Sequence, residues 1–535
     1  MNRSRRINFD WQIGLIALSA LAGLLIAYNR QAAALQFAIV ASAIAVYLVF
    51  ANLPDRVSIR GQMRPILAAL VAALPALIAG VFLITNNWTR WIGKIPALNS
   101  LLLLVANWLP GVTNPLNPNV IGGALAALLP LQVFALHRTR RAIRLPLIAL
   151  TVIALVLSQT RGAWLALLLV LGMWALWKTM TRWPIDKRRA RYWWLLAVAG
   201  GSVALMAVLT FTSLGESLLS LGGERLAIWH NSIDLVRDYP ITGLGLAGFE
   251  MVYSTYILLL HVGHTIHAHN LWLDMWLNQG IIGVFALAGM VLNAVWPRPA
   301  SAWRMPALLA LGVVLLYGLI DDPYYGVALL VVFAPLGLLI RPGLVAPTDF
   351  AANFSGFQPA YALWIAAAAF FVLGLFTPMG RAALEANLGA VAQTTAELSK
   401  YSWPEVPIQD ALRRLNAVDL NSAIAHYLAA LEIDPTNATA NRRLGQIELA
   451  REQFTKACSH LAAAYKALPL QRATRQLLGE CAAIAGQEVE AVSLWKTIDT
   501  KQNQLDIRKW WYGEYLQDYG RAARLQAAMD ILARE

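Results

Sequence analysis

Residues 145–177 read LPLIALTVIALVLSQTRGAWLALLLVLGMWALW, and this stretch decides the fold of the chain. Two apolar runs, 145–158 and 162–177, lie on either side of a short polar turn that contains Arg161. A helix bonds its backbone internally, so an apolar run of about 20 residues can cross the hydrocarbon of a bilayer. The stretch therefore predicts a helical hairpin that crosses a membrane twice.

Runs of the same kind fill the chain up to residue 378. The chain has 535 residues, of which 58% are hydrophobic and 14% charged, and its mean hydropathy is +0.54. These values exclude the three or four soluble domains that the length alone would suggest. We predict an all-α, polytopic membrane protein with eleven spans: 11–28, 33–53, 65–85, 118–136, 145–158, 162–177, 192–211, 280–296, 305–320, 324–340 and 359–377.

Two short segments bear on the predicted number of membrane spans. Run 101–109 is too short to span and is predicted to be interfacial or re-entrant; if it crosses, there are twelve spans. Residues 1–10 carry three arginines ahead of the first run, but ten more spans follow, so we expect a retained helix rather than a cleaved signal peptide.

The charges divide the chain into two domains. Residues 379–535 hold 18 Lys/Arg and 18 Asp/Glu, so the formal net charge of +13 comes from residues 1–378, with 25 basic and 12 acidic residues. We predict a membrane domain at 1–378 with a long outer loop at 212–270, a linker at 379–403 and a soluble helical domain at 404–535. No basic face carries stacking or base-reading groups, so no nucleic-acid partner is expected.

The distribution of positive charge predicts the orientation. With the N-terminus in the cytoplasm, the predicted cytoplasmic segments carry 19 Lys/Arg and the outer loops carry six. Loops that face the cytoplasm collect Lys and Arg. We therefore expect a multi-pass protein of the cytoplasmic (inner) membrane, with loop 212–270 and the C-terminal domain outside the cytoplasm.

The C-terminal domain contains a repeat with a period of 34 residues. It resembles a tetratricopeptide array of three matching sets. One unit is matched by Leu444, Gly445, Ala457, Leu461, Ala464 and Pro469; the unit before it ends with Ala423, Tyr427, Ala430 and Pro435; the unit after it is matched by Leu478, Gly479, Ala491 and Trp495. Such an array presents a groove to a protein partner, although a plain helical cap on the membrane domain is the alternative. Cys458 and Cys481 fall on helices that should pack together, as a disulfide or as two free thiols.

Polar residues gather at the predicted outer side of the membrane domain, where charge tends to mark a functional site. Segment 223–237 has the spacing of an amphipathic helix at the interface, with Leu226, Trp229, Ile233 and Val236 on its apolar face. An anchoring role for Arg161 and a solvated surface charge at Arg225 are the alternatives to a site. The outer polar residues are Asn117, Asn119, Arg161, Glu224, Arg225, Arg237, Asp321 and Asp322.

Four of the eight histidines lie close together: His261, His264, His267 and His269. Such a cluster could bind zinc, but it lacks a helical pair four residues apart and any supporting cysteine. We therefore predict no metal and no other cofactor.

His269 belongs to a longer pattern. His269-Asn270 is followed by Gly280-Ile281-Ile282-Gly283, and Arg161-Gly162-Ala163-Trp164-Leu165 begins a span. Together with Asn117-Pro118-Asn119 and Pro240-Ile241-Thr242-Gly243-Leu244-Gly245, these segments, in their order along the chain and all on the predicted outer side, resemble the O-antigen ligase superfamily. The resemblance covers about residues 11–378.

The resemblance implies metal-independent transfer of a glycan from an undecaprenyl-diphosphate carrier to a glycan or lipid-glycan acceptor. It assigns Arg161 and Arg225 to the diphosphate, since guanidinium grips phosphate oxygens in pairs. It assigns His269 as the general base, and histidine exchanges protons near neutral pH. Direct displacement would invert the anomeric carbon. Asn270, His267 or Asp274 could orient His269, and the sequence does not choose among them.

Other functions stay open. A polysaccharide polymerase or a protein O-oligosaccharyltransferase would use the same chemistry. A small-anion transporter belongs to a different class, and it should show broken helices with polar pairs near the middle of the bilayer and a repeated half. The sequence shows no such repeat.

Overall fold

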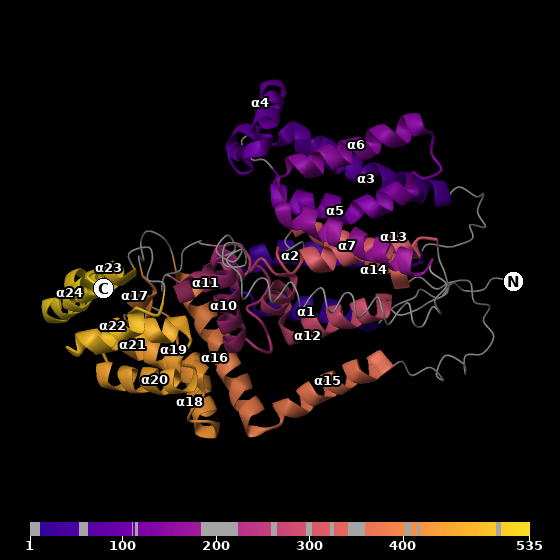
Figure 1. Cartoon of the computed structure of the whole chain (residues 1–535). Coiled ribbons are helices and arrows are strands. Elements are labelled where there is room, and N and C mark those ends of the chain that lie inside the picture. The colour runs from indigo at the N-terminus through magenta and orange to yellow at the C-terminus, as the bar shows by residue number, and fades with distance from the viewer. Residues whose placement is uncertain are drawn as a thin grey trace.

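The computed structural model describes residues 11–52, 63–109, 111–112, 116–182, 223–257, 265–295, 302–321, 326–340, 359–401, 408–414, 418–498 and 504–535. In these segments the regular structure is helical and no strand occurs. Figure 1 shows long helices side by side and, at one end of them, a stack of shorter helices that includes the C-terminus. The all-α fold of a polytopic membrane protein is confirmed.

Ten of the eleven predicted spans coincide with helices, and the remaining one, 192–211, lies outside the described residues. α12 begins nine residues before the predicted start at 280. The helices are α1 (Trp11–Ile26), α2 (Arg30–Asn52), α3 (Met63–Thr85), α5 (Pro118–Ala135), α6 (Arg141–Leu157), α7 (Arg161–Met180), α12 (Leu271–Val295), α13 (Arg304–Tyr317), α14 (Leu329–Ile340) and α15 (Pro359–Leu375).

The ten helices differ in length. Five of them, α2, α3, α5, α7 and α12, are long and apolar enough to cross a membrane, or six spans if bent α15 and α16 form one. The other five have 12 to 17 residues. At about 1.5 Å per residue, these reach less than the roughly 30 Å of a hydrocarbon core. By length and composition, the described helices thus support fewer full spans than eleven.

Run 101–109 forms helix α4 (Asn99–Trp108), preceded by the short helices η1 (Trp88–Trp91) and η2 (Pro96–Leu98). In Figure 1, α4 projects away from the long helices at the end that also bears the short-helix stack. Trp108 is 80% exposed, and three leucines of α4 are exposed as well. With ten residues, α4 is too short to span, as the sequence predicts.

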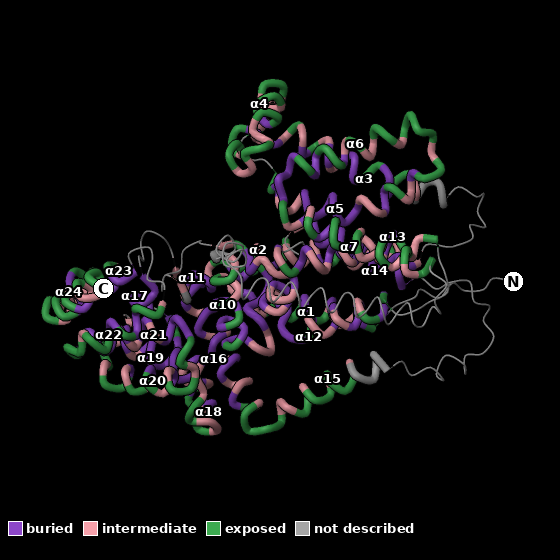
Figure 2. The backbone as a smooth tube through the Cα atoms, in the orientation of Figure 1, coloured by how far each residue is buried: buried purple, intermediate pink, exposed green. Residues whose placement is uncertain are grey.

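Exposed apolar side chains cover the outside of the long helices, as expected where lipid is the solvent. Figure 2 shows exposed and partly exposed residues along α6 and α15, and buried ones where α1, α2 and α12 meet. Leu35, Leu70 and Phe370 are each more than 60% exposed. Buried alanines and glycines let neighbouring helices approach closely, which is typical of packing inside membranes.

Two glycines allow two of the sequence motifs, segments 240–245 and 280–283, to pack directly against each other. Gly280 interrupts α12 with a φ of 68°, and Gly243 has a φ of 71°; both angles favour glycine. A Cβ at Gly243 would lie 2.6 Å from the Leu277 carbonyl oxygen, and one at Gly280 would collide with the Ile241 carbonyl. Segment 240–245 therefore packs directly on the kink of α12.

The predicted linker 379–403 is largely α16 (Pro378–Lys400), a 23-residue helix that turns by 80° from α15 and packs against α18. Apolar and small residues along α16 bury one face, which a flexible linker would lack. The helices after it are α17 (Gln409–Arg414), α18 (Asn421–Ile433), α19 (Ala438–Ala450), α20 (Phe454–Ala467), α21 (Arg472–Ile484), α22 (Glu488–Trp495), α23 (Gln504–Trp510), η4 (Trp511–Tyr515) and α24 (Tyr519–Leu532).

Helices α19 and α20 pair, as do α21 and α22, and equivalent contacts recur after 34 residues. Gly445 of α19 packs on Leu461 of α20, and Gly479 of α21 packs on Trp495 of α22. These contacts fit a repeat of helix pairs, and its assignment to the tetratricopeptide class remains a prediction. Cys458 and Cys481 form a disulfide between α20 and α21, which resolves the choice that the sequence left open.

A buried group of charges joins the two parts of the molecule. It consists of Asp238, the last residue of α10 (Gly223–Asp238), Tyr239 directly after that helix, and Arg442 and Arg443 of α19; we call it the docking cluster. Both arginines form ion pairs with Asp238, and Arg443 Nη2 donates to the Tyr239 hydroxyl at 2.8 Å. Helix α19 of the repeats is thus in contact with residues 238–239 of this chain's own membrane part.

Candidate active site

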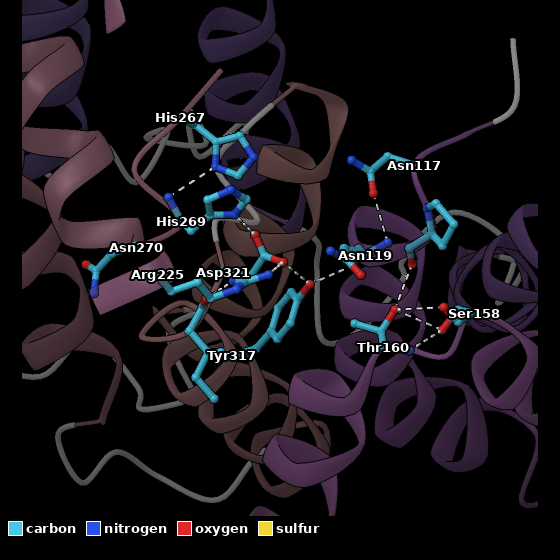
Figure 3. Close-up of polar contacts among 12 residues, drawn as sticks. Asn117, Asn119, Ser158, Thr160, Arg225, His267, His269, Asn270, Tyr317 and Asp321 are labelled. Carbon is cyan, nitrogen blue, oxygen red and sulfur yellow. Dashed lines mark hydrogen bonds and ion pairs between the residues drawn. The ribbon is translucent and has the colours of Figure 1, made fainter. Parts of the chain in front are cut away.

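The polar residues of five helix ends meet at the end of the bundle nearest the short-helix stack (Figures 1 and 3). They come from the start of α5, the turn before α7, the start of α10, the loop before α12 and the end of α13. We call this place the mouth and define the mouth cluster as Lys94, Arg161, Arg225, His269 and Asp321. Asn117 caps α5 by accepting from the Asn119 N–H at 2.9 Å.

His269 is held in an unusual backbone conformation. Its φ of 54° lies in the left-handed region, which a non-glycine residue adopts at a cost. Its N–H donates to His267 Nδ1 at 3.2 Å, and its carbonyl accepts from the Trp229 indole at 3.2 Å. These two contacts fix the residue from both sides and set the direction of its ring.

The ring of His269 is oriented by Asp321. His269 Nδ1 lies 2.9 Å from Asp321 Oδ1, and their side chains are 22% and 8% exposed. Because a carboxylate accepts, the proton is assigned to Nδ1, and Nε2 keeps the lone pair that a general base needs. Among the three candidates from sequence, none makes this contact; Asp321, noted only as a polar residue, does.

The three candidates instead shape the backbone around His269. Asp274 accepts from the Ala268 and Asn270 N–H groups at 2.7 and 3.3 Å. Asn270 caps α12 by accepting from two N–H groups, the nearer at 3.0 Å. Burial lowers the pKa of His267 to about 3, with a smaller effect of His269, so its neutral ring can accept the His269 N–H.

Asp321 also binds Arg225. The guanidinium lies 3.3 Å from Asp321 Oδ2 and donates to the Ile320 carbonyl. Burial alone would raise the pKa of Asp321, but the hydrogen bond from His269 and the charge of Arg225 outweigh it and hold the pKa below its usual range. The carboxylate is therefore ionised and can bind both partners at neutral pH.

A chain of contacts links Arg161 to Asp321. Its guanidinium donates to the Lys94 carbonyl at 2.6 Å, and Lys94 Nζ lies 3.5 Å from Asn119 Oδ1. The Tyr317 hydroxyl lies 2.7 Å from the Asn119 carbonyl oxygen and 3.2 Å from Asp321 Oδ2. Both proposed diphosphate-binding arginines thus belong to one chain of contacts, which runs through Lys94, Asn119, Tyr317 and Asp321.

The turn that carries Arg161 is fixed on α5. The Thr160 hydroxyl donates to the Pro118 carbonyl at 2.9 Å, and a Cβ on Gly122 would collide with the Thr160 side chain. Arg161 itself is exposed, so the turn presents its charge to the outside of the bundle.

The predictions for segment 223–237 and for the remaining outer polar residues can also be compared with the structure. Segment 223–237 forms α10 as predicted, and Leu226 and Ile233 of the expected apolar face are 41% and 43% exposed. The side of α10 that packs on α11, α12 and α16 buries polar residues together with Leu235 and Val236. Arg237 pairs with Asp234 at 2.6 Å, away from the mouth cluster. His261, His264, Asp322 and the side chain of Glu224 lie outside the described residues.

One group in the described segments has the composition of a metal site. The ligand atoms of His267, His269 and Asp321 all lie within 4.8 Å of one another. Two of these residues come from the histidine cluster, whose metal role the sequence argued against. Arg225 already places a positive charge on Asp321, which opposes a second cation there.

Lys94 and Tyr317 were missed from the sequence. Lys94 is one of six basic residues in the predicted outer loops, but it stands in a segment without a recognisable motif. Tyr317 lies within an apolar run, where an aromatic residue is ordinarily part of the core. The packing of α5 against α13 brings Tyr317 to Asn119, and the segment between η1 and η2 places Lys94 beside the same residue.

Part of this chain is similar to known proteins. Residues 146–288 match the family model described as O-Antigen ligase. This segment contains Arg161, Arg225 and His269, but not Lys94 or Asp321.

A General O-oligosaccharyltransferase of Acinetobacter baylyi is 29% identical to this chain over 219 residues. The match covers 36% of this chain and 37% of the relative, so it extends over little more than a third of each protein. No solved structure gave a significant match.

Proposed function

We propose that this protein transfers a glycan from an undecaprenyl-diphosphate carrier to an acceptor hydroxyl, in the manner of an O-antigen ligase. The contact between His269 and Asp321, beside Arg225, carries the proposal. It combines an oriented base with a cation that binds phosphate, at the membrane end where a lipid-linked donor would lie. The match of residues 146–288 to the O-Antigen ligase family supports the same chemistry.

The proposed step needs no redox partner. The acceptor oxygen attacks the anomeric carbon and forms the new glycosidic bond, while its proton passes to His269 Nε2. The bond between the anomeric carbon and the diphosphate oxygen breaks, and the carrier diphosphate leaves with the electron pair. Asp321 stabilises the resulting imidazolium, and Arg161 and Arg225 neutralise the growing charge of the leaving group. A single displacement of this kind inverts the anomeric carbon.

The mouth would face the outside of the cytoplasmic membrane. Two observations support this: the 19-to-6 division of basic residues, and the disulfide between Cys458 and Cys481, a bond typical of oxidising compartments. A reporter fused after Glu535 should behave as extracytoplasmic, and one fused within 178–191 as cytoplasmic. The opposite pattern would contradict the orientation.

The acceptor separates three variants of the reaction: ligation onto a lipid glycan, polymerisation of carrier-linked units, and O-linked oligosaccharide transfer to protein. The name of the Acinetobacter relative favours an O-oligosaccharyltransferase as the second candidate. Analysis of the carrier after gene deletion would separate ligase from polymerase, since long chains accumulate without a ligase and single units without a polymerase. A transporter is disfavoured because the polar cluster lies at one membrane face.

Replacing His269 by Ala tests the chemistry. The purified full chain in detergent, with an undecaprenyl-diphosphate glycan and an acceptor, should lose about 10²- to 10⁴-fold in transfer rate. His230, exposed on α10, provides the matched control His230→Ala, which should transfer as the wild type does. Full activity of His269→Ala, at unchanged thermal stability, would refute the assigned base.

A further inference from the structure

Lys94 has the placement of a ligand-binding cation rather than of a surface charge. It lies between η1 and η2, and its ammonium lies over the Trp91 indole at 5.1 Å from the ring centre. Its Nζ is 3.5 Å from Asn119 Oδ1, and its backbone carbonyl accepts from Arg161. The side chain is thus held at the mouth by one weak polar contact and one aromatic face.

The charges around Lys94 are unbalanced. Burial, Arg161 and Arg225 all lower the pKa of the Lys94 ammonium, and Asp321 opposes them. Within the described part of the mouth cluster, Asp321 is the acidic residue, and it already binds His269 and Arg225. Three cations, Lys94, Arg161 and Arg225, minus one carboxylate leave an excess of two positive charges.

We propose that Lys94 is a third diphosphate-binding residue and that the mouth cluster is matched in charge to a lipid diphosphate diester. Such a diester carries one negative charge on each phosphate, which together balance the excess at the mouth. This inference rests on the proposed function, because it assigns the anion that the two arginines would share.

The three cations have different tasks. The arginines are anchored by backbone carbonyls, so their planar groups offer donors in fixed directions. Lys94 is a point charge on a flexible stem and can follow the diphosphate as it leaves. When the glycosidic bond forms, the carrier diphosphate gains a further negative charge, and a third cation at the mouth lowers the barrier by stabilising it.

Direct binding tests the assignment without requiring transfer. The full chain in detergent is titrated with geranyl diphosphate, which carries the further negative charge of the departing carrier diphosphate, and, separately, with geranyl monophosphate. Lys94→Met should weaken binding of the diphosphate about tenfold or more, and binding of the monophosphate clearly less. Lys94→Arg should retain most of the affinity because the charge remains. The thermal stability of both variants should stay near wild type, since the Arg161 contact uses only the Lys94 backbone.

Lys178 provides the control. Its ammonium also lies over an indole, that of Trp174 at 4.9 Å, but at the far end of α7 from Arg161. Lys178→Met should bind geranyl diphosphate as the wild type does. Affinity of Lys94→Met within twofold of wild type, or an equal loss with the monophosphate, would overturn the inference. If the wild type binds geranyl diphosphate through Lys94 but transfers no glycan, the proposed function is wrong and the diphosphate site stands. If His269→Ala abolishes transfer and Lys94→Met changes neither binding nor transfer, the proposed function stands and the role of Lys94 is wrong.

Discussion

The mouth cluster and the docking cluster each contain two arginines and one aspartate, but they differ in the solvent exposure of the arginine side chains. At the docking cluster, the side chains of Arg442, Arg443 and Asp238 are 4%, 6% and 0% exposed. At the mouth, Arg225 is 31% exposed. Arg443 donates to Asp238, Gln393 and the Tyr239 hydroxyl and lies over the Tyr239 ring.

The difference separates structural from functional charges. A guanidinium removed from water must find lasting partners in the chain, because an unpaired buried charge is strongly destabilising. An accessible guanidinium at a mouth keeps donors for an incoming anion. Helix α10 joins the two clusters: Arg225 lies near its start and Asp238 at its end, about 20 Å apart at 1.5 Å per residue. The repeat-bearing part therefore anchors the helix that carries Arg225.

The largest effect is expected at the aspartate of the mouth. Asp321→Asn removes the charge that orients His269 and stabilises its protonated form, so the transfer rate should fall at least about a hundredfold. The control is Asp506→Asn, an exposed residue of α23, which should leave the rate unchanged. A rate for Asp321→Asn close to wild type would show that His269 does not depend on this carboxylate.

At the docking cluster, the effect should appear in stability. Asp238→Ala leaves Arg442 and Arg443 without their carboxylate, and breaking a buried pair in this way costs about 3–5 kcal/mol. Thermal unfolding of the full chain should shift clearly downward, whereas Arg225→Ala should shift it little. An unchanged transition for Asp238→Ala would remove the distinction between the two clusters.

A smaller effect is expected from changing the shape of a mouth cation. Arg161→Lys and Arg225→Lys keep the charge but lose the planar pair of donors, so each should slow transfer about tenfold. The double variant should cost less than the sum of the two free-energy losses if both grip one diphosphate. Near-wild-type rates for both single variants would return these arginines to anchoring and surface roles.

The smallest effect is expected from removing metal. The reaction proposed here relies on guanidinium groups, so a chelator such as EDTA should leave the transfer rate unchanged. A strong loss that zinc restores would instead assign a metal to His267, His269 and Asp321, whose ligand atoms lie close enough to share one.

Much of the fold could be predicted because a helix forms from neighbouring residues, so the length and spacing of apolar residues along the chain indicate where helices lie. The apolar runs located ten helices, and the 34-residue period located the pairs in which Gly445 and Gly479 pack. The start of α12 was misplaced because residues 271–279 mix polar and apolar side chains, and the helix continues through the kink at Gly280. Most of the expected linker belongs to α16, residues 378–400, one face of which is buried against α18.

The sequence by itself determined that this is a helical membrane protein and which motif residues stand at helix ends, because lipid forces each apolar run into a self-bonded helix. Only the tertiary structure decided which side chains meet. Asp321 reaches His269 across 52 residues, Tyr317 reaches Asn119 across 198, and Asp238 reaches Arg443 across 205. These contacts depend on how the helices pack against one another. The number of residues between two side chains does not determine the distance between them in the folded protein.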